Sequence, residues 1–250
     1  MRWVALYDDI GEGYAKTRQP DPRIERVLWD ALGEGSCVNV GAGAGSYEPR
    51  STRLAIERSP LMASQRRADA APVVIASAEA LPLADNSFET ALAVLTIHHW
   101  PERARTGLRE LCRVTRGRVV LLTWDPEAVP FWLTRDYFPE IVEIDLPIFP
   151  TISELGAELG GSVTSEPLPI PHDCVDGFLG AFWRRPAVYL DPAIRNGISS
   201  FCKLPAETVE RGIERLREDL ASGAWETRNA DLLNVDALDV GYRVVRVDYR

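Results

Sequence analysis

The chain has 250 residues, of which 46% are hydrophobic and 26% charged, and its formal net charge is −9. This length fits one large domain, or one domain with a cap. The acidic balance repels phosphate backbones and therefore disfavours a nucleic-acid substrate. Lysine occurs only at Lys16 and Lys203, so chemistry that depends on lysine, such as Schiff-base formation, has almost no candidate residue.

The chain start and the cysteines bear on location. The first thirty residues hold several acidic side chains and no apolar run after a basic start, so we expect no signal peptide. No stretch approaches the roughly 20 apolar residues of a membrane span. The four cysteines are widely spaced and form no C-x-x-C pair, which argues against a zinc site or a disulfide framework. We expect a cytoplasmic protein that binds neither metal nor membrane.

The first half of the chain alternates two kinds of pattern. Residues 22–33 have the apolar spacing of a helix, with Pro22 in its first turn and Gly33 at its end. Further helical patterns lie at about 59–70 and 101–115. The predicted strands are 37–40, 53–57, 71–76, 90–95 and 118–123. Because these strands are apolar almost throughout and alternate with helices, they predict a parallel sheet covered on both faces.

The pattern changes after Trp124. Residues 126–150 hold prolines among aromatic side chains and predict an irregular insertion. The elements expected after it are a helix at 152–160, a strand within 162–170, amphipathic helices broken by prolines over 173–222, and a closing strand at 242–249. Phe178, Phe182 and Trp183 fall on one face of a predicted helix, and we expect some of these aromatic side chains to line an apolar pocket.

A glycine-rich loop follows the first predicted strand. Gly41, Gly43 and Gly45 alternate with alanines, which lets the backbone turn sharply and approach a ligand with no Cβ in the way. We expect this loop to open a helix, whose N-terminus would offer free N–H groups and a partial positive charge. A purely structural turn is the alternative.

Three further signals follow the next strands. Glu57 ends the second strand, where neighbouring strand ends converge on one crevice and an acid can accept both hydrogen bonds of a ribose diol. An ion pair of Glu57 with Arg53 or Arg58 is the alternative. The loop over 77–89 can present backbone N–H groups and Glu79 to an adenine edge. The loop after the fourth strand runs from Leu95 to Trp100 and contains two histidines.

These four features, in this order, resemble the class I S-adenosylmethionine-dependent methyltransferases, particularly their small-molecule type 11 group. The resemblance covers about residues 7–124 and implies S-adenosylmethionine as the cofactor. Tyr14 and Arg18 resemble a Tyr-x-x-x-Arg segment that folds over the methionine part of the cofactor. The cofactor-binding residues that the resemblance implies are Tyr14, Arg18, Asn39, Gly41, Ala42, Gly43, Gly45, Glu57, Arg58, Met62, Ala78, Glu79, Leu95 and Thr96.

The chain departs from the family pattern at Asn39, where an Asp or Glu is usual. Asn39 brings no charge to complement the amino group of the cofactor, although its carbonyl oxygen can still accept a hydrogen bond.

The resemblance implies a Rossmann-like, doubly wound α/β fold with a mostly parallel seven-stranded sheet and a helical, aromatic cap inserted late in the chain. The boundaries that we expect are 1–125 for the cofactor-binding core, 126–161 for the aromatic insertion and its helix, 172–238 for the helical substrate cap, and 162–171 with 239–250 for the last sheet strands.

Methyl transfer from a sulfonium is an in-line displacement, so the protein must align the acceptor and, for a hydroxyl acceptor, remove a proton. Histidine is the natural base near neutral pH. The only histidines are His98, His99 and His172. We expect His99 and His172 to be the candidate bases, and we interpret His98 as more often structural. A hydrogen-bonded structural role is the alternative for each.

The predicted function is S-adenosylmethionine-dependent methyl transfer to a small, partly apolar molecule, with an oxygen acceptor as the first choice and nitrogen or carbon next. An NAD(P)-binding oxidoreductase is an alternative, which the G-x-G-x-G spacing and the absence of a Tyr-x-x-x-Lys pair disfavour. A catalytically inactive cofactor-binding regulatory protein is another. We expect no nucleic-acid partner, and a monomer or a homodimer.

Overall fold

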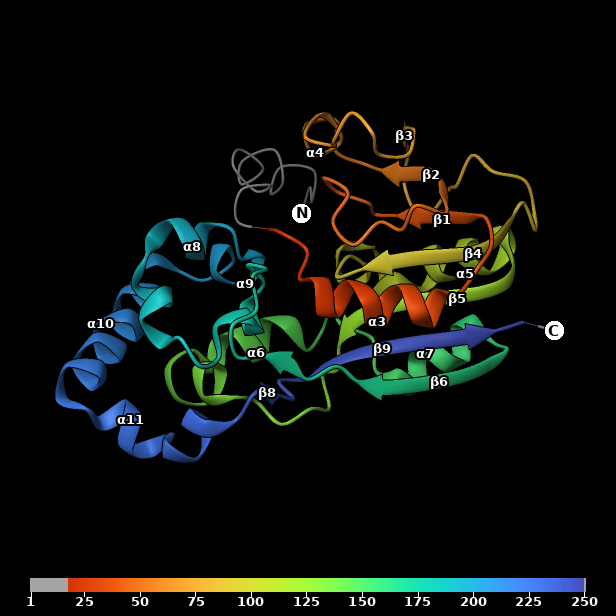
Figure 1. The fold of residues 1–250 in the computed structure, drawn as a ribbon. Coiled ribbons are helices and arrows are strands. Elements are labelled where there is room, and N and C mark those ends of the chain that lie inside the picture. The colour runs from red at the N-terminus through yellow and green to blue at the C-terminus, as the bar shows by residue number, and fades with distance from the viewer. Residues whose placement is uncertain (1–17, 250) are drawn as a thin grey trace.

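The computed structural model describes residues 18–249, so Tyr14 lies outside the described residues. A sheet with helices on both sides forms one part of the molecule, and a helical lobe lies beside it (Figure 1). The first half of the chain builds most of the sheet. Its elements are α3 (Pro22–Leu32), β1 (Cys37–Val40), β2 (Thr52–Glu57), α4 (Pro60–Ser64), β3 (Val73–Ile75), β4 (Phe88–Val94), η1 (Ile97–His99), η2 (Glu102–Ala104), α5 (Arg105–Val114) and β5 (Thr115–Trp124).

The second half builds the lobe and returns to the sheet for its last strands. Its elements are η3 (Leu133–Tyr137), α6 (Pro139–Asp145), α7 (Ile152–Leu159), β6 (Ser162–Pro167), β7 (Ile170–Pro171), η4 (Leu179–Phe182), η5 (Pro186–Leu190), α8 (Pro192–Asn196), α9 (Ser199–Cys202), α10 (Ala206–Ser222), α11 (Ala224–Arg228), η6 (Ala230–Asn234), β8 (Ala237–Leu238) and β9 (Tyr242–Asp248). The helices of residues 18–249 are each too short or too polar to span a lipid bilayer.

The sheet has seven strands in the order β3-β2-β1-β4-β5-β9-β6. Neighbouring strands from β3 to β5 pair in parallel, whereas β9 is antiparallel to both β5 and β6. This is the mostly parallel, doubly wound arrangement predicted from the sequence. The strand order reverses between β1 and β4, and the crevice at such a reversal, outside the carboxyl ends of the strands, is where open α/β sheets bind ligands.

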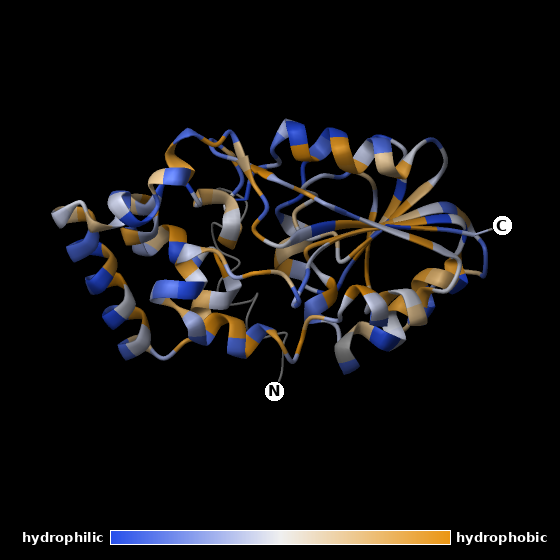
Figure 2. Ribbon diagram, turned by 90° about the horizontal axis from the view of Figure 1, so that it is seen from below, coloured by the Kyte–Doolittle hydropathy of each residue, from blue (hydrophilic) through white to orange (hydrophobic). Residues whose placement is uncertain are grey.

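Alternate side chains of the central strands face opposite layers of helices. Leu92 of β4 and Val120 of β5 are in the buried cluster of Leu28 on α3, while their neighbours Ala91 and Val119 are in the cluster that contains residues of α5 and α7. Figure 2, which views the molecule from below, shows apolar strands with helices above and below them. Both faces are therefore buried, which explains why these strands are apolar almost throughout.

The helical lobe is held together by aromatic side chains from two separate stretches of the chain. The Trp132 ring, from the insertion, lies 5.8 Å from the ring centre of Tyr189 and 5.2 Å from that of Trp225. The indole N–H of Trp132 also donates to the backbone oxygen of Trp183 at 2.6 Å. The insertion and the later helices thus pack as one body, and their buried cluster continues onto the α3 face of the sheet.

The prediction that the glycine loop opens a helix is wrong. Residues 41–51, all of them described, form turns and contain no helix. Gly41, Gly43, Gly45 and Tyr47 have φ angles of 71°, 53°, 93° and 62°, which a right-handed helix does not allow. The loop consequently offers backbone N–H groups without the aligned dipole of a following helix.

Other elements differ in extent from the prediction. The helix expected at 59–70 ends at Ser64, and two residues later Arg66 turns inward, where its side chain is 4% exposed. The insertion predicted to be irregular contains α6 and the π-helical turn η3. Phe178 immediately precedes the short 3₁₀ turn η4 and Phe182 is its last residue, and the period of three residues in such a turn does not bring i and i+4 to one face.

Candidate functional site

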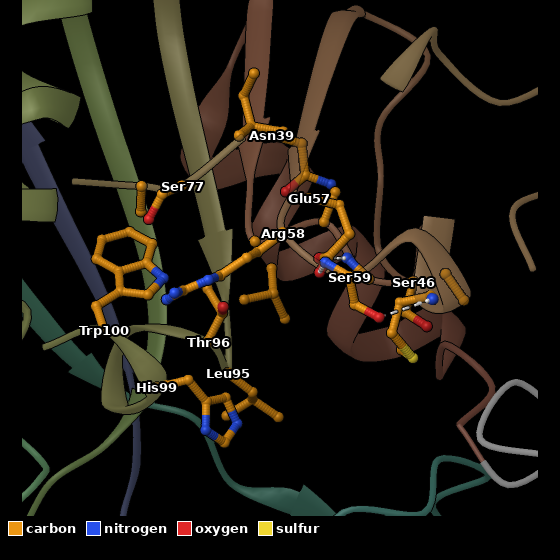
Figure 3. Close-up of a pocket in the computed structure, with 18 of the residues that line it drawn as sticks. Asn39, Ser46, Glu57, Arg58, Ser59, Ser77, Leu95, Thr96, His99 and Trp100 are labelled. Carbon is orange, nitrogen blue, oxygen red and sulfur yellow. Dashed lines mark hydrogen bonds between the residues drawn. The ribbon is translucent and has the colours of Figure 1, made fainter. Parts of the chain in front are cut away.

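The first of two adjoining cavities lies at the carboxyl ends of β1, β2, β3 and β4, and we call it the strand-end cavity. It occupies about 1150 Å³, including its mouth, and Figure 3 shows its lining. The lining residues are Arg18, Asn39, Gly41, Ala42, Gly43, Ala44, Ser46, Tyr47, Ile56, Glu57, Arg58, Ser59, Met62, Ala76, Ser77, Ala78, Glu79, Val94, Leu95, Thr96, His99 and Trp100.

This cavity brings together most of the residues predicted to bind the cofactor, drawn from four separate loops. Gly45 is an exception, since it lies against the guanidinium of Arg66 and does not line the cavity. Lining residues that the sequence reasoning did not name, such as Ser46, Ser59 and Ala76, come from the same loops, one to three positions from a named residue. The sequence therefore identified the loops that line the cavity and most of the lining positions, but not every position within those loops.

Gly41 is required where the first and fourth strands end side by side. Its backbone has a φ of +71°, and an ideal Cβ at this position would lie 2.1 Å from the Oγ1 atom of Thr96. The N–H groups of Gly41 and Ala42 both donate to the backbone oxygen of Ile56, at 2.9 and 3.0 Å. The glycine thereby allows the turn after β1 to contact the ends of both neighbouring strands.

Glu57 is held by the backbone of two loops. Its Oε2 accepts from the Gly43 N–H at 2.7 Å and its Oε1 accepts from the Ser59 N–H at 2.8 Å. The residue is only 9% exposed, and it lines the cavity (Figure 3). Each carboxylate oxygen has a second lone pair, so the group can still accept hydrogen bonds from a vicinal diol.

The second cavity, which we call the aromatic chamber, lies between the sheet and the helical lobe and occupies about 780 Å³, including its mouth. It shares Arg18, Leu95 and His99 with the strand-end cavity. The remaining lining residues are His98, Trp124, Pro130, Phe131, Thr134, Ile141, Val142, Asp145, Phe149, Phe178, Leu179, Gly197, Ile198, Ser199, Ser200, Val240 and Tyr242. Phe178 is the only one of the three aromatic residues singled out in the cap that lines it. Phe182 and Trp183 belong to the buried cluster of the lobe.

Two neutral imidazoles lie at the junction of the cavities. Burial, followed by the positive charges of Lys203 and Arg18, lowers the pKa of His99 to about 3. Burial also holds the pKa of His98 well below its usual range, and the neighbouring His99, Lys203 and Arg18 act in the same direction. The His98 ring stacks on Phe149, with ring centres 4.3 Å apart and planes 14° from parallel.

The structure does not bring His172 to either cavity. Its backbone N–H donates to the backbone oxygen of Asp236 at 2.9 Å, and its Nδ1 lies 3.2 Å from the same atom. This places it directly after β7, at the end of the small ribbon that β7 forms with β8. We therefore assign no part in the chemistry to His172. His98, which we expected to be more often structural, lines the chamber instead.

A buried carboxylate connects the segment before α3, the glycine loop and the lobe. Asp176 is fully buried and accepts from Arg18 Nε at 2.8 Å, from the Tyr47 hydroxyl at 2.8 Å and from its neighbour's backbone N–H at 2.7 Å. Arg18 lines both cavities, so Asp176 holds it at their junction. No pattern in the sequence indicates this contact, because Arg18 and Asp176 are 158 positions apart.

Comparisons with known proteins agree with this geometry. A family model described as a methyltransferase domain matches residues 33–123. A solved structure from Anabaena variabilis, described as a methyltransferase from an antibiotic biosynthesis pathway, is 34% identical, with a TM-score of 0.84 over 92% of this chain and 98% of that one. An S-adenosylmethionine-dependent methyltransferase of Thermotoga maritima has the same fold, with a TM-score of 0.58 at 17% identity over 99% of this chain and 98% of its own.

One curated relative is a methyltransferase that acts on tRNA. The mouse tRNA (carboxymethyluridine(34)-5-O)-methyltransferase ALKBH8 is 30% identical over 131 residues. The match covers 49% of this chain and 20% of the mouse protein, so this chain spans only a small part of that relative.

Proposed function

The chain belongs to the class I S-adenosylmethionine-dependent methyltransferases, and we propose that it methylates a small, partly apolar molecule bound in the aromatic chamber. Its cofactor is S-adenosylmethionine. The observation that carries the proposal is the contact between the two cavities, which share Arg18, Leu95 and His99. In-line transfer needs the methyl group and the acceptor atom to face each other, and a shared wall provides such a meeting point.

In the cofactor placement that we propose, the adenosine end lies toward Glu57 and the loop with Glu79, and the methionine end lies toward Asn39 and the glycine loop. When bound, the cofactor supplies an activated methyl group on its sulfonium. Glu57, already oriented by two backbone N–H groups, would accept from the ribose hydroxyls. Arg18, Leu95 and His99 would then surround the sulfonium end and separate it from solvent.

The chamber's lining supports a small acceptor with an apolar body. Aromatic side chains such as Trp124, Phe149 and Tyr242 form much of its wall, as in the mostly apolar sites that bind small molecules. The Anabaena variabilis structure, described as coming from an antibiotic biosynthesis pathway, supports the same class of acceptor.

An oxygen acceptor remains our first choice, with nitrogen or carbon next. His99 has a pKa of about 3, so near neutral pH it is unprotonated and can accept a hydrogen bond from a hydroxyl. The same value makes it a weak base, which favours acceptors that ionise easily, such as phenols and carboxylic acids, over alkyl alcohols.

An RNA acceptor is the main competing substrate. The tRNA methyltransferase relative points toward it, but a net charge of −9 and the apolar, aromatic lining of the acceptor cavity favour a small molecule. Membership of the methyltransferases does not favour an NAD(P)-dependent oxidoreductase or an inactive regulatory protein. A cytoplasmic location and a monomeric or homodimeric state stay predictions.

The test measures transfer of a labelled methyl group to phenols, carboxylic acids, amines and bulk tRNA. We expect label in an ionisable small molecule. A matched pair of variants tests whether the acceptor binds in the chamber. Phe149 lines the chamber, whereas Phe182 belongs to the core of the lobe. The two side chains are almost equally buried, at 6% and 7% exposed. Phe149→Leu should raise the KM for the acceptor and Phe182→Leu should not. Label in tRNA alone, or equal effects of the two variants, would refute the proposal.

A further inference from the structure

A buried ion pair lies behind the wall of the strand-end cavity and takes no direct part in the proposed reaction. The Nη2 atom of Arg66 lies 2.7 Å from Oε1 and 2.8 Å from Oε2 of Glu48. The two side chains are 4% and 7% exposed, and Oε1 also accepts from the Ala71 N–H at 3.1 Å. Burying two charges carries a desolvation cost that their attraction often fails to exceed, so stability alone is a weak reason for this pair.

The pair fixes the orientation of an amide that faces the cavity. The Nδ2 atom of Asn39 donates to Oε2 of Glu48 at 3.0 Å. A carboxylate can only accept, so the amide must present its NH₂ group to Glu48 and turn its carbonyl oxygen away. Without such a partner, the two ends of an asparagine amide are nearly interchangeable. Asn39 is itself 2% exposed and lines the strand-end cavity (Figure 3).

We propose that Glu48, held by Arg66, is a positioning residue that keeps the carbonyl oxygen of Asn39 directed at the ammonium group of the bound cofactor. This inference rests on the cofactor placement proposed above. The proposal explains how this chain can carry Asn39 where the family usually has an Asp or Glu. The negative charge is supplied by the Glu48 carboxylate, nine positions later in the chain, and it acts on the cofactor through the Asn39 amide. This negative charge also polarises the amide, which strengthens the outward carbonyl as an acceptor.

Two single variants disturb this arrangement in different ways. Glu48→Gln supplies one acceptor oxygen in place of two, so either Arg66 and Ala71 lose their partner or Asn39 flips and turns its NH₂ group toward the ammonium. Asn39→Asp places two carboxylates at a hydrogen-bonding distance, where one of them must take up a proton. Each variant should weaken binding of the cofactor's amino-acid end.

The double variant N39D/E48Q restores the pattern with the partners exchanged. The NH₂ group of the introduced glutamine would donate to the introduced aspartate, the glutamine carbonyl would accept from Arg66 and Ala71, and the net charge would equal that of the wild type. A carboxylate would then face the cofactor directly. The swap therefore separates positioning from mere packing, because the side-chain volumes hardly change in any of the three variants.

The experiment measures the Kd values of S-adenosylhomocysteine and of 5′-methylthioadenosine, which lacks the amino-acid end, by calorimetry on the full chain. We expect each single variant to weaken S-adenosylhomocysteine binding by about 10- to 100-fold, the loss of one hydrogen bond to a charged group. Methylthioadenosine binding should stay within about twofold of the wild type, and the swap should bring S-adenosylhomocysteine back to within about threefold.

Three results would overturn the proposal. The single variants could bind S-adenosylhomocysteine as the wild type does, both ligands could weaken together, or the swap could stay weak while its melting temperature matches the wild type. Failure of the proposed function is separate from these, since a protein that binds S-adenosylhomocysteine and methylates no small molecule would leave the comparison of variants intact.

Discussion

Replacing Gly41 by alanine tests how the strand ends are brought together. With φ at +71°, an alanine there occupies the left-handed region at a cost of about 1–2 kcal/mol. Its Cβ would also lie 2.1 Å from Oγ1 and 2.8 Å from Cγ2 of Thr96, and such overpacking costs about 1–3 kcal/mol more. We expect Gly41→Ala to lower the free energy of unfolding by about 2–5 kcal/mol.

Gly223→Ala is the matched control. Gly223 has almost the same φ, +75°, and an added Cβ would meet no atom of the described residues within 4 Å. Gly223→Ala should therefore show the conformational cost of about 1–2 kcal/mol alone. The difference between the two variants measures the clash with Thr96, and Thr96→Gly introduced beside Gly41→Ala should reduce that difference.

Urea titration gives the two free energies of unfolding, and calorimetry gives the Kd of S-adenosylhomocysteine. Relief of the clash must shift the turn whose N–H groups bond to Ile56, so Gly41→Ala should weaken cofactor binding at least about tenfold, and Gly223→Ala should leave it unchanged. Equal losses of stability in both variants, together with wild-type binding by Gly41→Ala, would refute this reasoning.

Three further predictions concern the junction of the cavities. His99→Ala should lower turnover more than cofactor affinity, and unchanged turnover with the native acceptor would remove His99 from the reaction. Asp176→Asn removes the fully buried carboxylate that accepts from Arg18 and Tyr47, so unfolding should become easier by about 3–5 kcal/mol; a loss below about 1 kcal/mol would contradict this. Burial keeps His98 and His99 unprotonated in the folded protein. Below about pH 6.5 the unfolded chain therefore binds more protons than the folded protein does, and the free energy of unfolding should fall as the pH is lowered from there toward about 3. Urea midpoints at about pH 7 and pH 5 check this, and His98→Phe should flatten the loss.

The sheet could be predicted because its strands are local patterns. The runs over 37–40, 90–95 and 118–123 are apolar enough to be buried on both faces, and each lies within a strand of the structure or extends it by one residue. The cofactor loops follow from the same reasoning, since strands that run in parallel end at one edge of the sheet. For that reason Asn39, Glu57 and Thr96 could be placed together without any contact being known.

What could not be predicted depends on contacts between distant residues or on backbone conformation. Tyr47 has a positive φ, which tyrosine rarely adopts, so the sequence does not indicate it. For the same reason the sequence could not show that no helix follows β1. Tyr47 and Asp176 are 129 positions apart, and no spacing rule joins them. Chain order predicted His172 at the entrance of a cap, but the short ribbon of β7 and β8 carries it away from the cavities.

The central claim is that the strand-end cavity holds the cofactor and the aromatic chamber holds the acceptor, with the methyl group passing between them. A structure of the protein with S-adenosylhomocysteine bound tests this most directly. We predict that the sulfur lies beside Leu95 and His99 and faces the chamber, with the ribose hydroxyls on Glu57. A sulfur turned away from the chamber, or a ribose out of reach of Glu57, would contradict the account.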